Sequence, residues 1–176
     1  MNIDDILNGY CSGMKDLHKG LEEIKNIDYI GLKNEGGPAS ICKLNFKLYS
    51  FQSRDFVLCF SIKKINNSIV LIAKNCKHSE AQISKSHIRG NMHFCLIIDS
   101  KSKNLCKITY LSYVDLCGSV NTKLYSNALL KRPVVFIPKL NEIILKRKTE
   151  NVKRPLEHYK ILDTYDEIIM NENKKN

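Results

Sequence analysis

Cysteine and histidine are the side chains of this sequence most able to act as nucleophiles, general bases or metal ligands. Cys76 and His78 are separated only by Lys77, and His93 and Cys95 only by Phe94. Zinc ligands typically come in pairs with two to five residues between them, and neither pair has that spacing. The seven cysteines show no CxxC spacing, and most lie in apolar runs: Cys11, Cys42, Cys59, Cys76, Cys95, Cys106 and Cys117. We expect free buried thiols in a reducing compartment, with no disulfide framework, metal or other cofactor.

The histidines are scattered rather than grouped with nucleophiles. They are His18, His78, His87, His93 and His158. A Ser/His/Asp or Cys/His centre needs a nucleophile and a base within hydrogen-bond reach, and no spacing in the chain indicates such convergence. An enzyme would have to use polar groups inside a pocket, for which Tyr110, His93 and Asp115 are the candidates. We therefore expect no catalytic residues and no enzymatic activity.

The chain is strongly basic. Its formal net charge is +10, and lysine supplies nearly all of the excess, since arginine occurs only at positions 54, 89, 132, 147 and 154. Such a chain is attracted to anionic surfaces, either nucleic acid or an acidic membrane leaflet. Readers of specific bases depend on arginine, so a lysine excess favours diffuse attraction over base recognition. An ordinary solvated surface explains the same charge.

The elements that would position these side chains follow from length and hydrophobic periodicity. With 176 residues the chain can bury one sizeable core, and no stretch approaches the roughly 18 apolar residues of a membrane span. The N-terminus carries acidic residues and no basic region typical of a secretory signal, so we expect a cytoplasmic location. Residues 3–19 have a helical apolar spacing, with Gly20 as a stop.

Between residues 21 and 117 the apolar period changes from 3.6 to 2, which indicates strands. We predict six of them: 22–33, 39–50, 54–65, 69–75, 87–99 and 105–115. Short turn-rich connections predict an antiparallel meander. In the third strand Phe56, Leu58, Phe60 and Ile62 share one face, so that face must be covered.

A long apolar helix after about residue 120 is the element that could cover this face. Ser119 or Asn121 could cap its start, and Pro133 and Pro138 predict a kink or break near residue 132. Its apolar stripe comprises Leu124, Ala128, Leu129, Val135, Phe136, Leu140, Ile143 and Ile144. The sequence thus predicts an α+β fold in which a curved antiparallel sheet of about six strands packs on a long C-terminal helix. Residues 149–176 read as a polar tail with one short helix around 155–170.

Several segments resemble the steroidogenic-acute-regulatory-related lipid-transfer (START) domain. The run Arg54-Asp55-Phe56-Val57 resembles the family's RDFV signature, and Asp115-Leu116-Cys117-Gly118 resembles the D-x-x-G turn that precedes its last helix. The ordered match covers about residues 3–147, and we place the domain at 1–148. The resemblance implies a helix-grip fold around a hydrophobic cavity that holds one lipid, without metal or catalysis.

The resemblance also implies which residues would line the cavity, although a plain filled core explains the same pattern. They are Leu58, Phe60, Ile62, Phe94, Leu96, Ile98, Tyr110, Leu129 and Phe136. Arg54 and Asp55 are expected to be structural, tying a loop to the last helix. Phe51 precedes the signature where the family has a gate loop. A basic edge of the last helix could meet an acidic leaflet: Lys131, Arg132, Lys139, Lys146, Arg147 and Lys148.

The sequence departs from the family in three ways. The family's opening helix and first three strands have no match here, so we expect a truncated sequence, a minimal member of the family, or a chain that closes its open sheet edge by forming a homo-oligomer. Phe60 stands where several members have a buried arginine, and the preceding strand, residues 41–44, lacks the acidic partner. This favours an acyl lipid such as a phospholipid over a sterol. Ser119 and Asn121 replace the family's Trp and Pro.

We therefore predict lipid binding and transfer between membranes, with a lipid ligand and transient contact with an anionic membrane surface. An enzyme on the same fold, cyclase-like or hydrolase-like, is the alternative. A basic nucleic-acid-binding module ranks last, because no aromatic-studded polar sheet face is present. Nucleic acid is thus not an expected partner.

Overall fold

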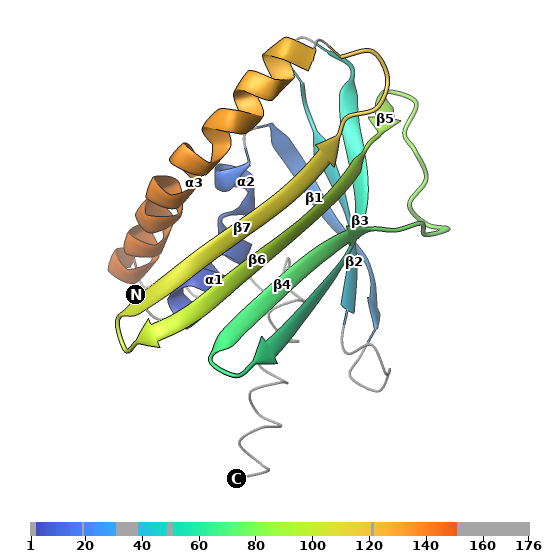
Figure 1. Ribbon diagram of the computed structural model, residues 1–176. Coiled ribbons are helices and arrows are strands. Elements are labelled where there is room, and N and C mark those ends of the chain that lie inside the picture. The colour runs from blue at the N-terminus through green and yellow to red at the C-terminus, as the bar shows by residue number, and fades with distance from the viewer. Residues whose placement is uncertain (1–2, 19, 31–38, 49–50, 121, 151–176) are drawn as a thin grey trace.

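The computed structural model describes residues 3–18, 20–30, 39–48, 51–120 and 122–150, and these form one α+β unit (Figure 1). Three helices and seven strands follow one another along the chain as α1 (Ile3–Ser12), α2 (Met14–Leu17), β1 (Leu21–Ile30), β2 (Ala39–Phe46), β3 (Ser53–Ile65), β4 (Ser68–Asn75), β5 (His87–Arg89), β6 (Asn91–Ser102), β7 (Leu105–Asp115) and α3 (Thr122–Glu150). This arrangement confirms the predicted antiparallel sheet with a long helix after it.

The strands pair in the order β1-β2-β3-β4-β6-β7, and every pair on this path is antiparallel. The short strand β5 lies off the path and pairs in parallel with the start of β3, from Ser53 to Asp55. In Figure 1 the three helices lie together on one side of the curved sheet. The helix α1 contacts both α3 and β6, so it lies between the last helix and the inner face of the sheet.

The inner face of the sheet carries the main core. Successive strand residues point to opposite faces, so the apolar alternation read from the sequence becomes a continuous buried surface. Phe56, Leu58, Phe60 and Ile62 of β3 are each at most 3% exposed, as the pattern predicted. Val57, on the outer face, belongs to a separate small cluster with Ile41 and Ala81. Ala81 lies in the connection 76–86, so this polar connection packs against the outer face.

The predicted strand 87–99 is divided into β5 and β6 at Gly90, which gives seven strands instead of about six. A Cβ atom at Gly90 would lie 2.4 Å from Cε1 of Phe56, so only glycine allows the backbone to pass this ring. The amide of Gly90 donates a 2.9 Å hydrogen bond to the carbonyl of Asp55. The chain therefore leaves β3 at this point and enters the antiparallel path beside β4.

Of the kink or break predicted near residue 132, the break is wrong, because α3 runs from Thr122 to Glu150 through both prolines. Proline costs a helix one backbone hydrogen bond and some strain, and the burial of Phe136, Leu140 and Ile144 at 1–5% exposure offsets that cost. The apolar stripe is narrower than predicted, since Val135 is 62% exposed.

The limits of two predicted helices also change. The first, 3–19, consists of α1 and α2, separated at Gly13. The predicted tail begins inside α3, which continues to Glu150. The rest of that tail, with its short helix around 155–170, lies outside the described residues, as does the proposed cap Asn121.

Candidate functional site

Five aromatic rings meet between the inner face of the sheet and the helices. Tyr110 of β7 stacks on Phe136 of α3, with ring centroids 5.0 Å apart and planes at 22°. Phe94 of β6 lies 5.9 Å from Tyr110 and 5.7 Å from Phe60 of β3. Tyr10 of α1 completes the group, at 6.1 Å from Phe94 and 6.0 Å from Phe136. Rings from three strands and two helices thus share one apolar region.

Aliphatic residues extend this region along the sheet. Leu58, Ile62, Leu96 and Ile98 are all completely buried. The strand β4 lies between β3 and β6 and joins their rows, since Leu71 pairs with both Ile62 and Leu96. The structure therefore brings eight of the nine predicted lining residues into one core, seven of them on the inner face of the sheet and Phe136 on α3. The ninth, Leu129, is in α3, at a position whose side chain is outside those described.

The prediction of lining residues missed the contribution of α1. Ile6, Leu7 and Tyr10 are at most 1% exposed and belong to the same core as the strand residues. His18, only 5% exposed, makes an edge-on contact with the Tyr10 ring at 6.2 Å. The helical spacing of Ile6 and Tyr10 indicates a buried face. It does not indicate that this face packs against the sheet. His18 and Tyr10 thus place polar groups within this apolar region.

Arg54 fastens β3 to the loop that leads into α3. Its side chain is 1% exposed, and its Nε donates a 2.6 Å hydrogen bond to the carbonyl of Leu116. Its Nη2 donates to the carbonyl of Cys117 at 3.0 Å, and its Nη1 donates to the carbonyl of Gln52. The guanidinium therefore satisfies two backbone carbonyls of the loop after β7 and one just before β3. This is the structural role expected from the sequence.

Asp55 makes the second connection, on the opposite face of the same strand. Its carboxylate accepts hydrogen bonds of 2.8 and 3.1 Å from Nε and Nη2 of Arg89 in β5, and Lys43 Nζ lies 3.1 Å away. Burial by itself would raise the pKa of Asp55, but the hydrogen bonds and charges of Arg89 and Lys43 outweigh it and hold the pKa below its usual 3.8. Asp55 is thus ionised at neutral pH and joins β2, β3 and β5.

The described part of the chain gives no support to a catalytic centre. Tyr110 faces the inner side of the sheet, whereas His93 stacks on Tyr113 of the outer side, with ring centroids 6.0 Å apart. Asp115 accepts a 2.8 Å hydrogen bond from the amide of Cys117. Burial raises the pKa of Cys42 to about 11, so this thiol is not a nucleophile at neutral pH. Among the described residues no three His, Cys, Asp or Glu side chains are grouped as metal ligands.

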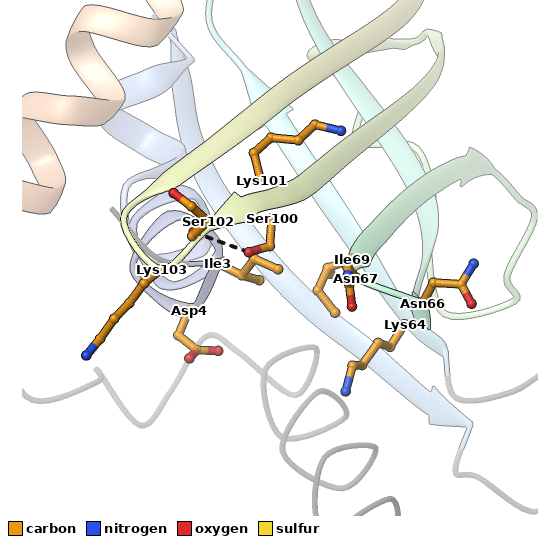
Figure 2. Close-up of a pocket in the computed structure, with 10 residues that line it drawn as sticks. All are labelled: Ile3, Asp4, Lys64, Asn66, Asn67, Ile69, Ser100, Lys101, Ser102 and Lys103. Atoms are coloured by element: carbon orange, nitrogen blue, oxygen red, sulfur yellow. Dashed lines mark hydrogen bonds between the residues drawn. The ribbon is translucent and has the colours of Figure 1, made fainter.

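A hollow of about 520 Å³ lies where two hairpins and the start of α1 meet (Figure 2). Ile3 and Ile69 form its apolar side; Ile69 is part of the core and Ile3 packs against it. Its other residues are polar. Asp4 belongs to α1, and the rest come from the β3–β4 and β6–β7 hairpins: Lys64, Asn66, Asn67, Ser100, Lys101, Ser102 and Lys103. The apolar interior therefore approaches the surface at this end of the sheet.

Comparison with known proteins identifies the family. A protein-family model for the START domain matches residues 23–150, so the chain belongs to the START-domain family. No curated protein sequence matches it.

Solved structures show the same helix-grip fold at low sequence identity. Human STARD10 aligns with a TM-score of 0.72 and 17% identity over 85% of this chain. The lipid transfer and protein localization domain of human StarD13 (DLC2) aligns with a TM-score of 0.67 and 16% identity over 81% of this chain. Human StAR-related lipid transfer protein 5 aligns with a TM-score of 0.65 and 12% identity over 80% of this chain. The alignments cover 60%, 71% and 70% of those three chains, respectively.

Proposed function

We propose that this protein binds one lipid between the inner face of its sheet and its helices, and carries or presents that lipid between membranes. The observation that supports this most directly is the continuous apolar face that faces α1 and α3. Burying a lipid's hydrocarbon surface there is favourable by roughly 25 cal/mol per Å². The proposed lining is the set predicted from the sequence, Leu58, Phe60, Ile62, Phe94, Leu96, Ile98, Tyr110, Leu129 and Phe136, with Tyr10 added from α1.

An acyl lipid such as a phospholipid fits this face better than a sterol. Phe60 is 3% exposed and packs edge-on against Phe94, so no charge is available there to hold a sterol hydroxyl. The neighbouring inner residues of β2, Ser40 and Cys42, contact each other at 3.7 Å between Oγ and Sγ and carry no charge at neutral pH. The lining therefore offers hydrocarbon contact with few polar anchors.

The remaining parts of the proposal concern setting and partners. We propose a cytoplasmic protein that meets membranes transiently, does not act on nucleic acid, leaves its lipid chemically unchanged and can form homo-oligomers. No helix within the described residues is long and apolar enough to cross a bilayer. A native mass spectrum of the protein purified from cells would report both the mass of a bound lipid and the number of subunits.

A matched pair of substitutions tests the site. Leu96→Trp adds an indole on the inner face of β6, whereas Ile72→Trp adds one on the outer face of the neighbouring strand β4, where Ile72 is 45% exposed. We expect the inner variant to lose most of the lipid recovered by extraction and mass spectrometry, and to slow exchange of fluorescent phospholipid between vesicles at least about fivefold. The outer variant should keep both. Equal lipid recovery from both variants, or no lipid from the native protein, would refute the proposed site.

A further inference from the structure

The two hairpin tips at one end of the sheet form a single basic, partly apolar surface, called here the hairpin end. It consists of residues 63–67 at the β3–β4 turn and 101–105 at the β6–β7 turn, all of them exposed. The tips are side by side, since the amide of Ser100 donates to the carbonyl of Asn67 at 3.0 Å and Ser68 Oγ donates to Asp99 at 2.5 Å.

The charge of the hairpin end is of one sign. Lys63, Lys64, Lys101 and Lys103 lie within these ten residues, which include no acidic residue. Among the described residues, Asp99 lies 4.0 Å from Lys101 Nζ, and Asp4 lines the hollow. On α3, by contrast, the basic groups Lys139 and Lys148 are paired with Glu142 and Asp5 at 2.9 and 2.7 Å. Two lysines on the basic edge of the last helix are therefore paired with carboxylates.

Two large apolar side chains project from the same tips. Ile65 is 53% exposed and Leu105 is 61% exposed, one on each hairpin. Apolar side chains beside lysines suit the boundary between lipid headgroups and acyl chains. There the apolar side chains are buried among the acyl chains, and the lysines meet phosphate groups. The hollow of about 520 Å³ between the tips, with amide and hydroxyl groups on its polar side, leaves room for a headgroup (Figure 2).

We propose that the hairpin end is the surface by which this protein docks on an anionic lipid bilayer. The inference rests on the proposed function in one respect, because a lipid carrier has to reach a membrane. The hairpin end has no aromatic residue, and stacking of bases on aromatic rings is the usual device of proteins that bind single-stranded nucleic acid. The charge and the apolar tips together therefore favour a bilayer over nucleic acid.

The test measures binding of the full chain to vesicles by flotation. The vesicles are phosphatidylcholine alone or phosphatidylcholine with 30% phosphatidylserine, each at about 0.1 and 0.5 M salt. The test variant replaces Lys63, Lys64, Lys101 and Lys103 by Gln. A control variant replaces Lys25, Lys74, Lys77 and Lys85 by Gln, which removes the same charge from four exposed positions outside the hairpin end. A second pair compares Ile65→Ser/Leu105→Ser with Ile83→Ser/Leu145→Ser, all four residues being exposed.

We expect the native chain to bind the anionic vesicles more tightly than the neutral ones, and more weakly at high salt. The hairpin-end lysine variant should lower the partition coefficient at least about tenfold and its control less than about threefold. The Ile65/Leu105 variant should lower it more than its control. Equal losses in test and control variants would overturn the proposal in favour of diffuse charge attraction. The proposal would also be overturned if the native chain did not bind vesicles. It would likewise be overturned if the chain bound a 20-nucleotide RNA more tightly than the anionic vesicles and lost that binding in the hairpin-end lysine variant.

Extraction and mass spectrometry of each variant separate this proposal from the proposed function. A hairpin-end variant that still contains lipid but no longer floats with vesicles supports docking at this surface. A native chain that floats with anionic vesicles but contains no lipid supports docking and refutes lipid carriage.

Discussion

Arg54 and Asp55 are adjacent in the sequence but make connections on opposite sides of the sheet. Side chains alternate along a strand, so Arg54 reaches the loop after β7 and Asp55 reaches β2 and β5. Both residues are at most 1% exposed, so their charges are stable only with these partners in place. Two consecutive residues thereby fix one end of β3 to three other parts of the fold.

The first prediction concerns the charge of Asp55. We expect Asp55→Asn to lower the free energy of unfolding at pH 7 by about 3 kcal/mol, because it leaves Arg89 and Lys43 without a counter-charge in a buried place. Since the pKa of Asp55 is lower in the folded protein than in the unfolded chain, its contribution is complete above the ordinary pKa of 3.8 and is lost as pH falls through the folded pKa. Urea unfolding of both proteins between pH 2 and pH 7 measures this.

The difference between the native chain and Asp55→Asn should therefore shrink below about pH 4. Asp28→Asn is a suitable control, because Asp28 is exposed and pairs with His78 at 3.7 Å near the surface. A constant difference across this pH range would contradict the assignment of the stabilisation to the ionised Asp55 carboxylate.

The structural role of the pair could be predicted from the sequence, but its partners could not. Two charged residues at the start of an apolar strand must be neutralised or hydrogen-bonded if they are buried, and this can be inferred from the strand alone. Leu116, Cys117 and Arg89 lie 34 to 63 residues further along the chain, and their proximity depends on the pairing of whole strands. The same limit explains why His18 and Tyr10 were not linked to the lining residues.

Two glycines set the distance between α1 and α3. A Cβ atom at Gly9 would lie 2.4 Å from Cγ1 of Ile144, and one at Gly13 would lie 2.6 Å from Cδ1 of Ile143. Side chains do not tolerate contacts this short. Glycine at these two positions therefore lets the branched side chains of α3 pack directly against the backbone of residues 9 and 13. The lack of a side chain at both glycines therefore sets how closely α3 packs against α1.

The second prediction follows from this contact. An exposed Gly→Ala change inside a helix would stabilise it by roughly 0.5–1 kcal/mol, but Gly9→Ala should lower the free energy of unfolding by about 1–3 kcal/mol, since the new methyl group overlaps Ile144. Lys15→Ala, at an exposed position of α2, is the control and should change stability by less than about 0.5 kcal/mol. Thermal and urea unfolding measure both.

A double-mutant cycle checks the cause. If overlap is responsible, Gly9→Ala combined with Ile144→Ala should cost clearly less than the sum of the two single changes. Strict additivity would point instead to an effect within α1 alone.

The strands could be predicted from the sequence more reliably than the helices. A period of two is a local property, and the predicted β3, β4 and β7 differ from the observed ones by at most one residue at either end. The continuity of α3 depends on the burial of Phe136, Leu140 and Ile144 against α1 and the sheet, which overrides the local effect of Pro133 and Pro138. The division at Gly90 depends on the Phe56 ring, which is distant in sequence.

At the scale of the whole molecule, the proposed ligand would contact both the sheet and the helices that cover it. Anything that binds only the folded state stabilises it by mass action. The third prediction is that removing bound lipid lowers the midpoint of thermal unfolding, and that adding phospholipid to 100 times its dissociation constant restores about 2.7 kcal/mol. Calorimetry of native and lipid-free protein measures this.

The Leu96→Trp and Ile72→Trp variants serve as controls for this effect. Adding phospholipid should stabilise lipid-free Ile72→Trp as it does the native chain, and should leave Leu96→Trp unchanged. Equal stabilisation of both variants would locate the lipid outside the inner face.

The fold of the whole molecule could be predicted because patterning and family resemblance agree, and the family match over residues 23–150 confirms it. Whether the inner face holds a ligand could not be predicted, because a filled core and a lined cavity produce the same alternation. The hairpin end was also missed, since Lys64 and Lys103 are 39 residues apart and line the same hollow only because β4 pairs with β6.

The helix α1 begins beside the end of α3, where Lys148 Nζ donates a 2.7 Å hydrogen bond to Asp5 (Figure 1). The first and last described residues of the domain therefore lie close together. A short linker from residue 150 to residue 3 would join them, and new termini could be opened at exposed Ser79 in the connection between β4 and β5. Such a circular permutant would keep every strand pair, and it would allow a fluorescent protein or a second domain to be attached on the outer side of the sheet, away from the helices.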